Sequence, residues 1–241
     1  MLIKTKGIVF RVVKYGETSV ICDVYTSERG LQSYIINSVR AKKPKFHAGL
    51  LQVMSLIDLV AYAKEEKTLN YIKELRADYV YQTIPFQILK SSVGLFMAEL
   101  AQKTIKESEE NQALFVFLYE IFIFLDKTTL PIINLHIWFA VQLTAYLGFM
   151  PDGLEDDVET YFFDLKNGLY TLAPPAHGVY LGTDQAKLLD TFLNTSLEDC
   201  HKIALNANER RAFIRSIIQY YQCHVANFTE LKTFTVLQEV L

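Results

Sequence analysis

The stretch "SVRAKKPKF" (38–46) packs four cations into six positions, a spacing suited to neutralising the phosphates of a polyanion. These cations are Arg40, Lys42, Lys43 and Lys45. They repel one another at short range, and Pro44 prevents a regular strand or helix, so we expect a loop here. Short basic runs are often solvated turns that keep a strand end soluble. The density of charge favours a loop that grips phosphates over that alternative.

The positive charge extends over the N-terminal segment around this loop. Residues 1–50 carry nine Lys and Arg residues against three acidic residues, a net charge of +6. The remaining residues carry a net charge of −9, and the whole chain carries −3. A positive N-terminal module on a negative body predicts contact with a polyanion through that module.

Aromatic residues are interleaved with the cations of this module. A groove for single-stranded nucleic acid combines cations for the phosphates with flat side chains on which unpaired bases stack. Besides the cations of the loop, the candidate DNA-binding residues are Arg11, Lys14, Tyr15, Arg29, Tyr34 and Phe46. Aromatic side chains are mostly buried, so the alternative for Tyr34 and Phe46 is a position in the core, with cations that only promote solubility.

Signatures of enzymes are missing from the sequence. It has no phosphate-binding loop ending in Gly-Lys-Ser/Thr, no Gly-rich dinucleotide turn and no Ser between glycines at a nucleophile elbow. We therefore predict no catalytic residue and no cofactor. The acidic run 155–159 ("EDDVE") has the oxygen ligands that a divalent cation needs, but it lacks the alternating spacing of a calcium loop. A solvated loop is the favoured interpretation.

Cysteine and histidine offer a second possibility for a metal. The three cysteines, Cys22, Cys200 and Cys223, are too few for a disulfide framework, which indicates a reducing compartment. Two of them directly precede His201 and His224. Adjacent residues rarely both ligate one tetrahedral zinc ion, so no metal site is predicted.

Nothing in the sequence predicts a membrane span or a secretory leader. The most apolar stretch, 113–125, is shorter than the roughly 20 residues that a spanning helix needs, and it contains Glu120. The N-terminus has no long apolar run before a small-residue cleavage site. We therefore expect a cytoplasmic protein with no membrane contact.

The elements that must position the basic module are predicted strands. Five segments are rich in β-branched and aromatic residues and are separated by turn sequences such as "GE" and "SERG": 7–15, 18–26, 31–39, 50–62 and 68–80. Five strands at this spacing predict a small closed or nearly closed barrel, because one open sheet would expose long apolar edges. This barrel domain is placed at 1–80.

From Pro85 the apolar period becomes helical, which predicts an all-α domain over 81–241. Helices are expected at 85–107, 110–127, 131–148, from Asp184 onward and at 206–225. The first is expected to begin at Pro85 and to bury a face made of Ile88, Leu89, Ser92, Leu95, Phe96 and Leu100. An irregular insertion at about 150–183 contains a predicted hairpin across "KNG". The predicted fold class is α+β, a β-barrel followed by helices.

The segment 7–46 resembles the beginning of the RecO family of bacterial DNA repair proteins. The shared features are the "YGETS" turn, the "DVYTSERG" turn and the short basic loop, in that order. Farther along, "YLGFMPD" (146–152) and the closing "LKTF" are similar to later motifs of the family. The resemblance implies an OB-fold barrel followed by a helical domain. It also implies binding to single- and double-stranded DNA, annealing of complementary strands, and cooperation with RecR in loading RecA.

The chain departs from that family in two ways. Many members hold zinc with two Cys pairs after the "LGF" motif, whereas 149–183 contains no Cys, so we expect no zinc. We expect apolar packing to replace the metal, through Tyr161, Phe162, Phe163, Leu169, Tyr170 and Leu172. The family also binds the acidic, apolar tail of single-strand binding protein. The predicted helix 131–148 offers only His136 as a cation for such a tail, so no pocket is assigned.

Together these features predict a non-enzymatic mediator of recombinational DNA repair, associated with the nucleoid, that binds DNA and anneals strands. Cations that neutralise the phosphates of two strands lower the repulsion between the strands and release condensed counterions. The alternative is a protein-interaction adaptor whose helical body is the working part and whose barrel touches no nucleic acid.

Overall fold

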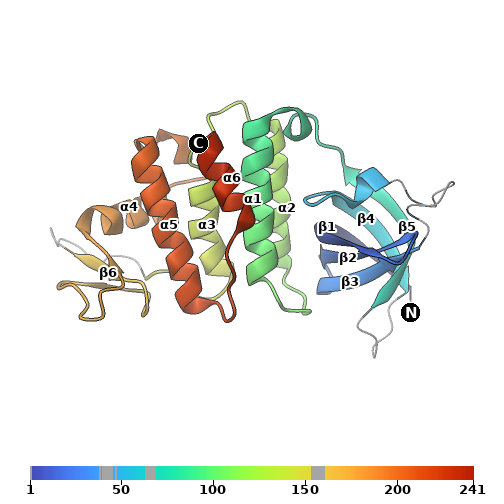
Figure 1. Cartoon of the computed structure of the whole chain (residues 1–241), viewed down its shortest axis with the longest axis horizontal. Coiled ribbons are helices and arrows are strands. Elements are labelled where there is room, and N and C mark those ends of the chain that lie inside the picture. The colour runs from blue at the N-terminus through green and yellow to red at the C-terminus, as the bar shows by residue number, and fades with distance from the viewer. Residues whose placement is uncertain (1, 38, 40–45, 47, 63–68, 153–160) are drawn as a thin grey trace. The chain divides into compact units, whose positions relative to one another are not determined.

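The computed structural model describes residues 2–37, 39, 46, 48–62, 69–152 and 161–241. The chain forms two compact units, Met1–Thr128 and Thr129–Leu241. The first unit contains a barrel and two long helices, and the second contains the remaining helices and a small sheet (Figure 1). The domain boundary predicted at residue 80 falls inside the first unit, and it stays a prediction.

The first unit begins with a closed barrel of five strands. These are β1 (Leu2–Tyr15), β2 (Ser19–Thr26), β3 (Gly30–Ile36), β4 (Leu56–Tyr62) and β5 (Asn70–Tyr79), in the order β1-β2-β3-β5-β4. All neighbours are antiparallel except β3 and β5, whose pairing is parallel. The prediction of a five-stranded barrel is confirmed. Two boundaries differ, because β1 begins at Leu2 and a 3-10 turn (Ala48–Leu51) precedes β4.

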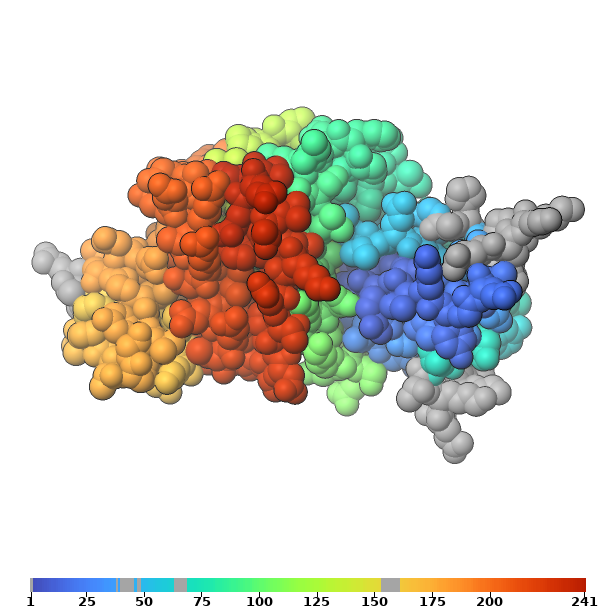
Figure 2. Space-filling model, in the orientation of Figure 1, coloured from blue at the N-terminus to red at the C-terminus, as the bar shows by residue number. Residues whose placement is uncertain are grey.

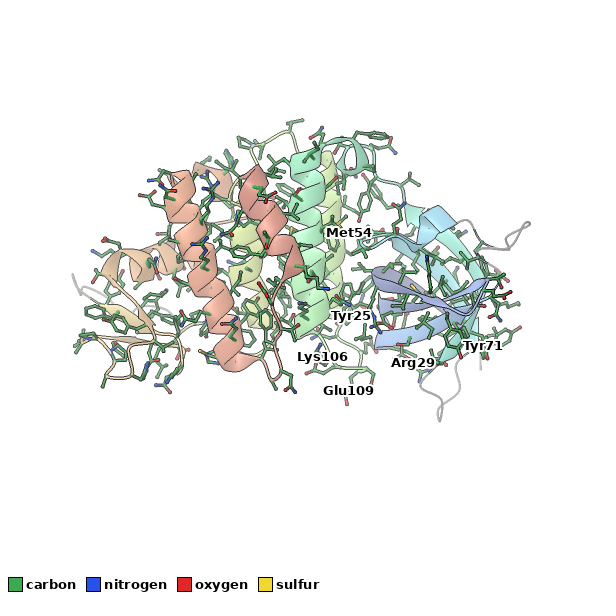
Figure 3. The ribbon with its side chains drawn as sticks, viewed as in Figure 1. Tyr25, Arg29, Met54, Tyr71, Lys106 and Glu109 are labelled. Atoms are coloured by element: carbon green, nitrogen blue, oxygen red, sulfur yellow. The ribbon has the colours of Figure 1, made fainter. Side chains whose placement is uncertain are left out.

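Alternate residues of the strands fill the barrel, and part of its outside is buried as well. Val9, Cys22 and Leu59 belong to the inner core. On the outside, the Phe10 ring stacks on Tyr25, with centroids 5.7 Å apart, and Tyr25 stacks on a phenylalanine of α2 (Gln112–Lys127). Tyr25 is 1% exposed and lies between the barrel and the helices (Figure 3). The helices therefore cover one side of the barrel's outer surface.

The first long helix differs from its prediction at its start and on its buried face. Pro85 lies in a 3-10 turn (Ile84–Phe86), and α1 (Ile88–Thr104) begins after it. Ser92, Phe96 and Leu100 are buried as expected, whereas Ile88 is 76% exposed and Leu95 is 38% exposed. The buried face is rotated toward Gly94, where a Cβ atom would lie 2.6 Å from the sulfur of Met54. The close approach of Met54 to Gly94 determines which face of α1 is buried. The periodicity of apolar residues alone does not reveal this face.

A buried carboxylate joins the barrel to both helices. Asp126, at the end of α2, is 1% exposed and accepts hydrogen bonds from the backbone N–H groups of Gln82, Thr83 and Ile84 at 2.8–3.1 Å. Tyr79, the last residue of β5, donates its hydroxyl to the same carboxylate at 2.9 Å. Burial would raise the pKa of Asp126, but the backbone donors outweigh it and lower the pKa to about 2.

A lysine completes this junction. Lys90 of α1 is 6% exposed, and its Nζ donates to the carbonyl oxygens of Asp126 and Thr128, each at 2.9 Å. These are two of the carbonyls that the end of α2 leaves without helical partners. Burial lowers the pKa of Lys90. The end of α2 is thus held at its last carbonyl oxygens by Lys90 and at the Asp126 carboxylate by the backbone of residues 82–84.

The second unit contains α3 (Leu135–Tyr146), α4 (Thr183–Asn194), α5 (Ala207–His224) and α6 (Lys232–Val240), with a 3-10 turn at Cys200–Lys202. Side chains of α3 hold its neighbours: Trp138 Nε1 donates to the carbonyl oxygen of Thr195 at 2.8 Å. The hydroxyl of Tyr221 on α5 donates to Ala140 at 2.7 Å. The nearly all-apolar α3 is buried as predicted for a helix inside a bundle.

The irregular insertion contains a small sheet with the order β7-β6-β8. The hairpin predicted across "KNG" is confirmed by β6 (Phe162–Asp164) and β7 (Leu169–Thr171), and β8 (Tyr180–Leu181) adds a third strand that the sequence did not predict. The segment predicted as an irregular insertion with a hairpin therefore forms a three-stranded sheet. A strand of two residues such as β8 is too short to show an alternating pattern.

Packing in this sheet agrees only in part with the apolar packing that was expected to replace the metal. Phe163 is fully buried, and Tyr161 is 8% exposed. Leu169, on the edge strand β7, and Leu172, just after it, are 47% and 72% exposed, so their assignment to this apolar packing was wrong. A polar contact is present instead: the Asp164 carboxylate lies 3.0 Å from Nε2 of His177. Burial would raise the pKa of Asp164, but its bond to His177 and further donors lower the pKa to about 2.

Candidate nucleic-acid interface on the barrel

The hairpin between β1 and β2 carries two of the predicted residues into solvent. Gly16 has a φ of +61°, a conformation that glycine adopts without strain, and it permits the tight turn after Tyr15. Lys14 is exposed, and Tyr15 is 50% exposed. The first strands, drawn in dark blue, form part of the visible surface of the barrel (Figure 2). A cation and an aromatic ring thus lie side by side in sequence at one end of β1.

Arg11 lies on the outer face of β1, which Tyr15 shares, and is held by an ion pair. Its Nε lies 2.6 Å from Oδ2 of Asp23, and Ser33 donates its hydroxyl to the other oxygen of that carboxylate at 2.7 Å. The Arg11 side chain is 53% exposed. Since the pair spans β1, β2 and β3, it orients the guanidinium across three strands, where a phosphate can approach it from solvent.

Arg29 is not brought together with these residues. It lies in the turn after Thr26, at the end of β2 opposite to Tyr15, which is about 23 Å away along an eight-residue strand. The neighbouring Gly30 has a φ of +57° and contacts the carbonyl oxygens of Glu107 and Glu109, so a Cβ there would collide with them. Arg29 therefore sits beside an acidic segment, apart from the other candidates.

Tyr34 and Phe46 belong to the barrel core. They are 4% and 8% exposed, and both pack with Cys22 and Val39 inside the barrel. Burial raises the pKa of the Tyr34 hydroxyl above its usual range. Neither ring offers a face to a base in this structure, so their proposed stacking role is corrected to the alternative, a core position. For Tyr34 an inward position on β3 is responsible, whereas Phe46 lies between β3 and β4 and packs into the barrel core.

The basic loop itself lies outside the described residues. Arg40, Lys42, Lys43 and Lys45 therefore remain predictions. The described residues before and after them, Val39 and Phe46, are both buried in the barrel core. At the end of β3, Asn37 accepts a hydrogen bond from Ser19 at 3.0 Å, so the chain leaves the sheet beside the β1–β2 hairpin that carries Lys14 and Tyr15.

Sequence reasoning missed further cations on the outer face of β1 and β5. Lys6 donates to Asp78 at 2.8 Å, and Arg76 lies 2.5 Å from Asp58. The hydrogen bond to Asp78 raises the pKa of Lys6. The Arg76–Asp58 pair borders a cavity of about 340 Å³ that Lys4 also lines. The signal was available: the alternating lysines of "IKTKG" place two cations on one face of a strand.

This arrangement can bind anions, and it contains no assembled nucleophile. Among the described residues, no group of three or more His, Cys, Asp or Glu side chains is placed to hold a metal ion. Cys200 is 3% exposed, His201 contacts the carbonyl of Glu198, and His224 contacts that of Leu165. No helix in the described part of the chain is long and apolar enough to cross a membrane.

The small sheet of the second unit leads to a prediction about zinc. Elemental analysis of protein purified without added metal is expected to find much less than one zinc per chain, because 149–183 has no Cys and Asp164 is already engaged by His177. A stoichiometric zinc ion that survives gel filtration would contradict this. His201→Ala and His224→Ala variants would then test the cysteine–histidine pairs.

Comparison with known proteins covers both units. The model of the recombination protein O N-terminal domain matches residues 1–79, and that of the C-terminal domain matches residues 85–232. The DNA repair protein RecO of Bacteroides fragilis is 33% identical over 241 residues, and that of Phocaeicola vulgatus is 32% identical over 240. The RecO of Flavobacterium johnsoniae is 32% identical over 241 residues. Each alignment covers 100% of this chain and 99% of the relative. The chain, with its five-stranded barrel and helical body, therefore belongs to the RecO family of DNA repair proteins.

Proposed function

We propose that this chain binds single- and double-stranded DNA through the outer face of its barrel and anneals complementary strands. In this proposal it acts with RecR to help load RecA on single-stranded DNA, in the cytoplasm and at the nucleoid. The observation that carries the proposal is the exposed pair Lys14 and Tyr15 on the hairpin that Asn37, just after β3, contacts through Ser19, in a chain of the RecO family.

The proposed mechanism is electrostatic. Cations such as Arg11 and Lys14 neutralise phosphates, and each neutralised phosphate releases condensed counterions, which favours binding at low salt. Two strands held in one positive field repel each other less, so base pairing proceeds faster. No bond is made or broken in this scheme, and we accordingly propose that the chain is not an enzyme.

Single-strand binding protein belongs to the same proposal. Its acidic, apolar tail calls for cations beside apolar side chains. A cavity of the second unit has this composition: Arg210 and Arg211 of α5 lie beside Ile214, and α6 contributes Leu237. This cavity is a candidate for the pocket that the sequence alone did not provide.

A titration with labelled oligonucleotides tests the DNA-binding part. Affinity for a single strand should fall steeply between about 50 and about 200 mM salt, and the protein should accelerate annealing of complementary strands at the lower salt. An adaptor without nucleic-acid contact would show no shift at either salt concentration. Binding of RecR by a protein that binds no DNA would favour that adaptor.

A further inference from the structure

A row of apolar side chains crosses all five strands on the outside of the barrel. Paired residues of neighbouring strands point to the same face of a sheet, so the register defines such rows. One row consists of residues paired in sequence around the barrel: Leu2, Tyr62, Tyr71, Ile35, Ile21 and Val13. We call this set the outer row. All six residues are apolar or aromatic, although they point away from the core.

The outer row is exposed where a comparable row is covered. Ile8, Tyr25 and Leu56 also form an outward row of the same barrel, and they are 0–1% exposed beneath α1 and α2. In the outer row, Leu2, Tyr62, Tyr71 and Val13 are 43–49% exposed. Figure 3 shows Tyr71 on the barrel well away from the helices, whereas Tyr25 faces them. An exposed apolar row of this length is typical of an interaction surface.

Two tyrosines form the centre of this row. Tyr62 and Tyr71 are directly paired across β4 and β5, which places their Cβ atoms about 5 Å apart. They are 47% and 49% exposed, so each offers part of a ring to solvent. Tyrosine rings at this spacing suit the flat faces of unpaired bases, which stack on aromatic side chains without regard to sequence.

The charges next to the row favour a polyanion as its occupant. Lys4 and Arg11 are each two residues along β1 from members of the row, and Lys73 is two residues along β5 from Tyr71. The side chains of Arg11 and Lys73 are 53% and 42% exposed. Two acids are also present, since Asp23 pairs with Arg11 and Glu74 lies 3.6 Å from Lys73. Cations therefore stand at both ends and beside the centre of an aromatic surface.

We propose that the outer row is a stacking platform for unpaired bases, with Tyr62 and Tyr71 as its principal contacts. This inference rests on the proposed binding of DNA. It adds that the outer row is the part of the surface that distinguishes single-stranded DNA from duplex DNA. Bases of a duplex are stacked on one another and cannot stack on these rings. The platform therefore contributes to binding of single strands alone, while the surrounding cations serve both forms.

The test compares Tyr62→Ala and Tyr71→Ala with Phe86→Ala, which removes another exposed aromatic ring, 83% exposed, away from the row. Affinities are measured for an oligo-dT strand, for an abasic strand of equal length and charge, and for a duplex, over a salt series. Each tyrosine variant should bind oligo-dT about 5- to 100-fold more weakly, with the salt slope unchanged. Binding to the abasic strand and the duplex should stay at the wild-type level, and Tyr71→Trp should restore affinity.

The outcomes separate this inference from the proposed function. If wild type binds DNA with the expected salt dependence but the tyrosine variants match Phe86→Ala on oligo-dT, the stacking platform is refuted and DNA binding stands. If abasic and dT strands weaken equally in folded variants, stacking is also refuted. A change in self-association by ultracentrifugation, with DNA affinity unchanged, would assign the row to a protein contact instead. Absence of any DNA binding by wild type overturns both proposals.

Discussion

Asp126→Ala is expected to lower the free energy of unfolding by about 3–5 kcal/mol at neutral pH. The substitution leaves the backbone N–H groups of Gln82, Thr83 and Ile84 without their acceptor, together with the hydroxyl of Tyr79. The bond from Ile84 is buried, and the others are partly buried. Each unsatisfied buried donor costs about 1–3 kcal/mol, and such losses are only partly additive because they share one acceptor. Urea unfolding followed by circular dichroism measures the change.

A matched control and a pH series make this test specific. Glu120→Ala removes an exposed carboxylate from the same helix and should alter stability by about 0.5 kcal/mol or less. Because the folded pKa of Asp126, about 2, lies below its ordinary value of 3.8, the carboxylate's contribution is present above pH 4 and fades as the pH falls toward 2. The difference between wild type and variant should shrink over that interval. A variant as stable as wild type at pH 7 would contradict the role of the junction.

Lys42→Ala combined with Lys43→Ala is expected to reduce the salt slope of single-strand binding by about one to one and a half units, because each phosphate neutralised on a single strand contributes about 0.7. Affinity for all sequences should fall alike at low salt, since phosphate contacts carry no sequence information. A labelled oligonucleotide titrated across a salt series measures both quantities.

The control for the lysine pair is Lys187→Ala with Lys202→Ala, two exposed cations of the second unit that change the net charge equally. This control should leave the slope unchanged, and both double variants should keep the wild-type melting temperature within a few degrees. An unchanged slope in the folded Lys42 and Lys43 variant would refute their phosphate role. Arg11, Lys14 and the other barrel cations would then account for the binding.

The barrel and most helices could be predicted from the sequence because their signals are local. Runs of β-branched and aromatic residues between "GE" and "SERG" turns indicate strands whatever their partners are. The capping box at the start of α5, in which Asn206 and Glu209 bond to each other's backbone, is equally local. Such features need no knowledge of which residues meet in space.

Which residues of each strand point into the barrel could not be predicted from the sequence. This limited the prediction of residues at the candidate site. Several outward positions of this barrel are apolar, because helices cover Ile8 and Tyr25 from outside. Alternation of polar and apolar residues is therefore weak, and the sequence left Tyr34, which faces the core, open to either a stacking role or a core position. Tyr71, two residues into β5, was overlooked although it is exposed. Only the pairing register between distant strands shows that Tyr34 points inward and Tyr71 points outward.

The cover that α1 and α2 provide for the barrel bears on how the protein can be divided for experiments. A fragment ending at residue 79, where the N-terminal family model stops, would lack α1 and α2 and expose Phe10 and Tyr25 to water. It would also lose the Asp126 carboxylate that accepts the hydrogen bond from the Tyr79 hydroxyl. Such a truncation should express poorly or aggregate. One ending at Thr128 retains both helices and is the better starting point for isolating a soluble barrel.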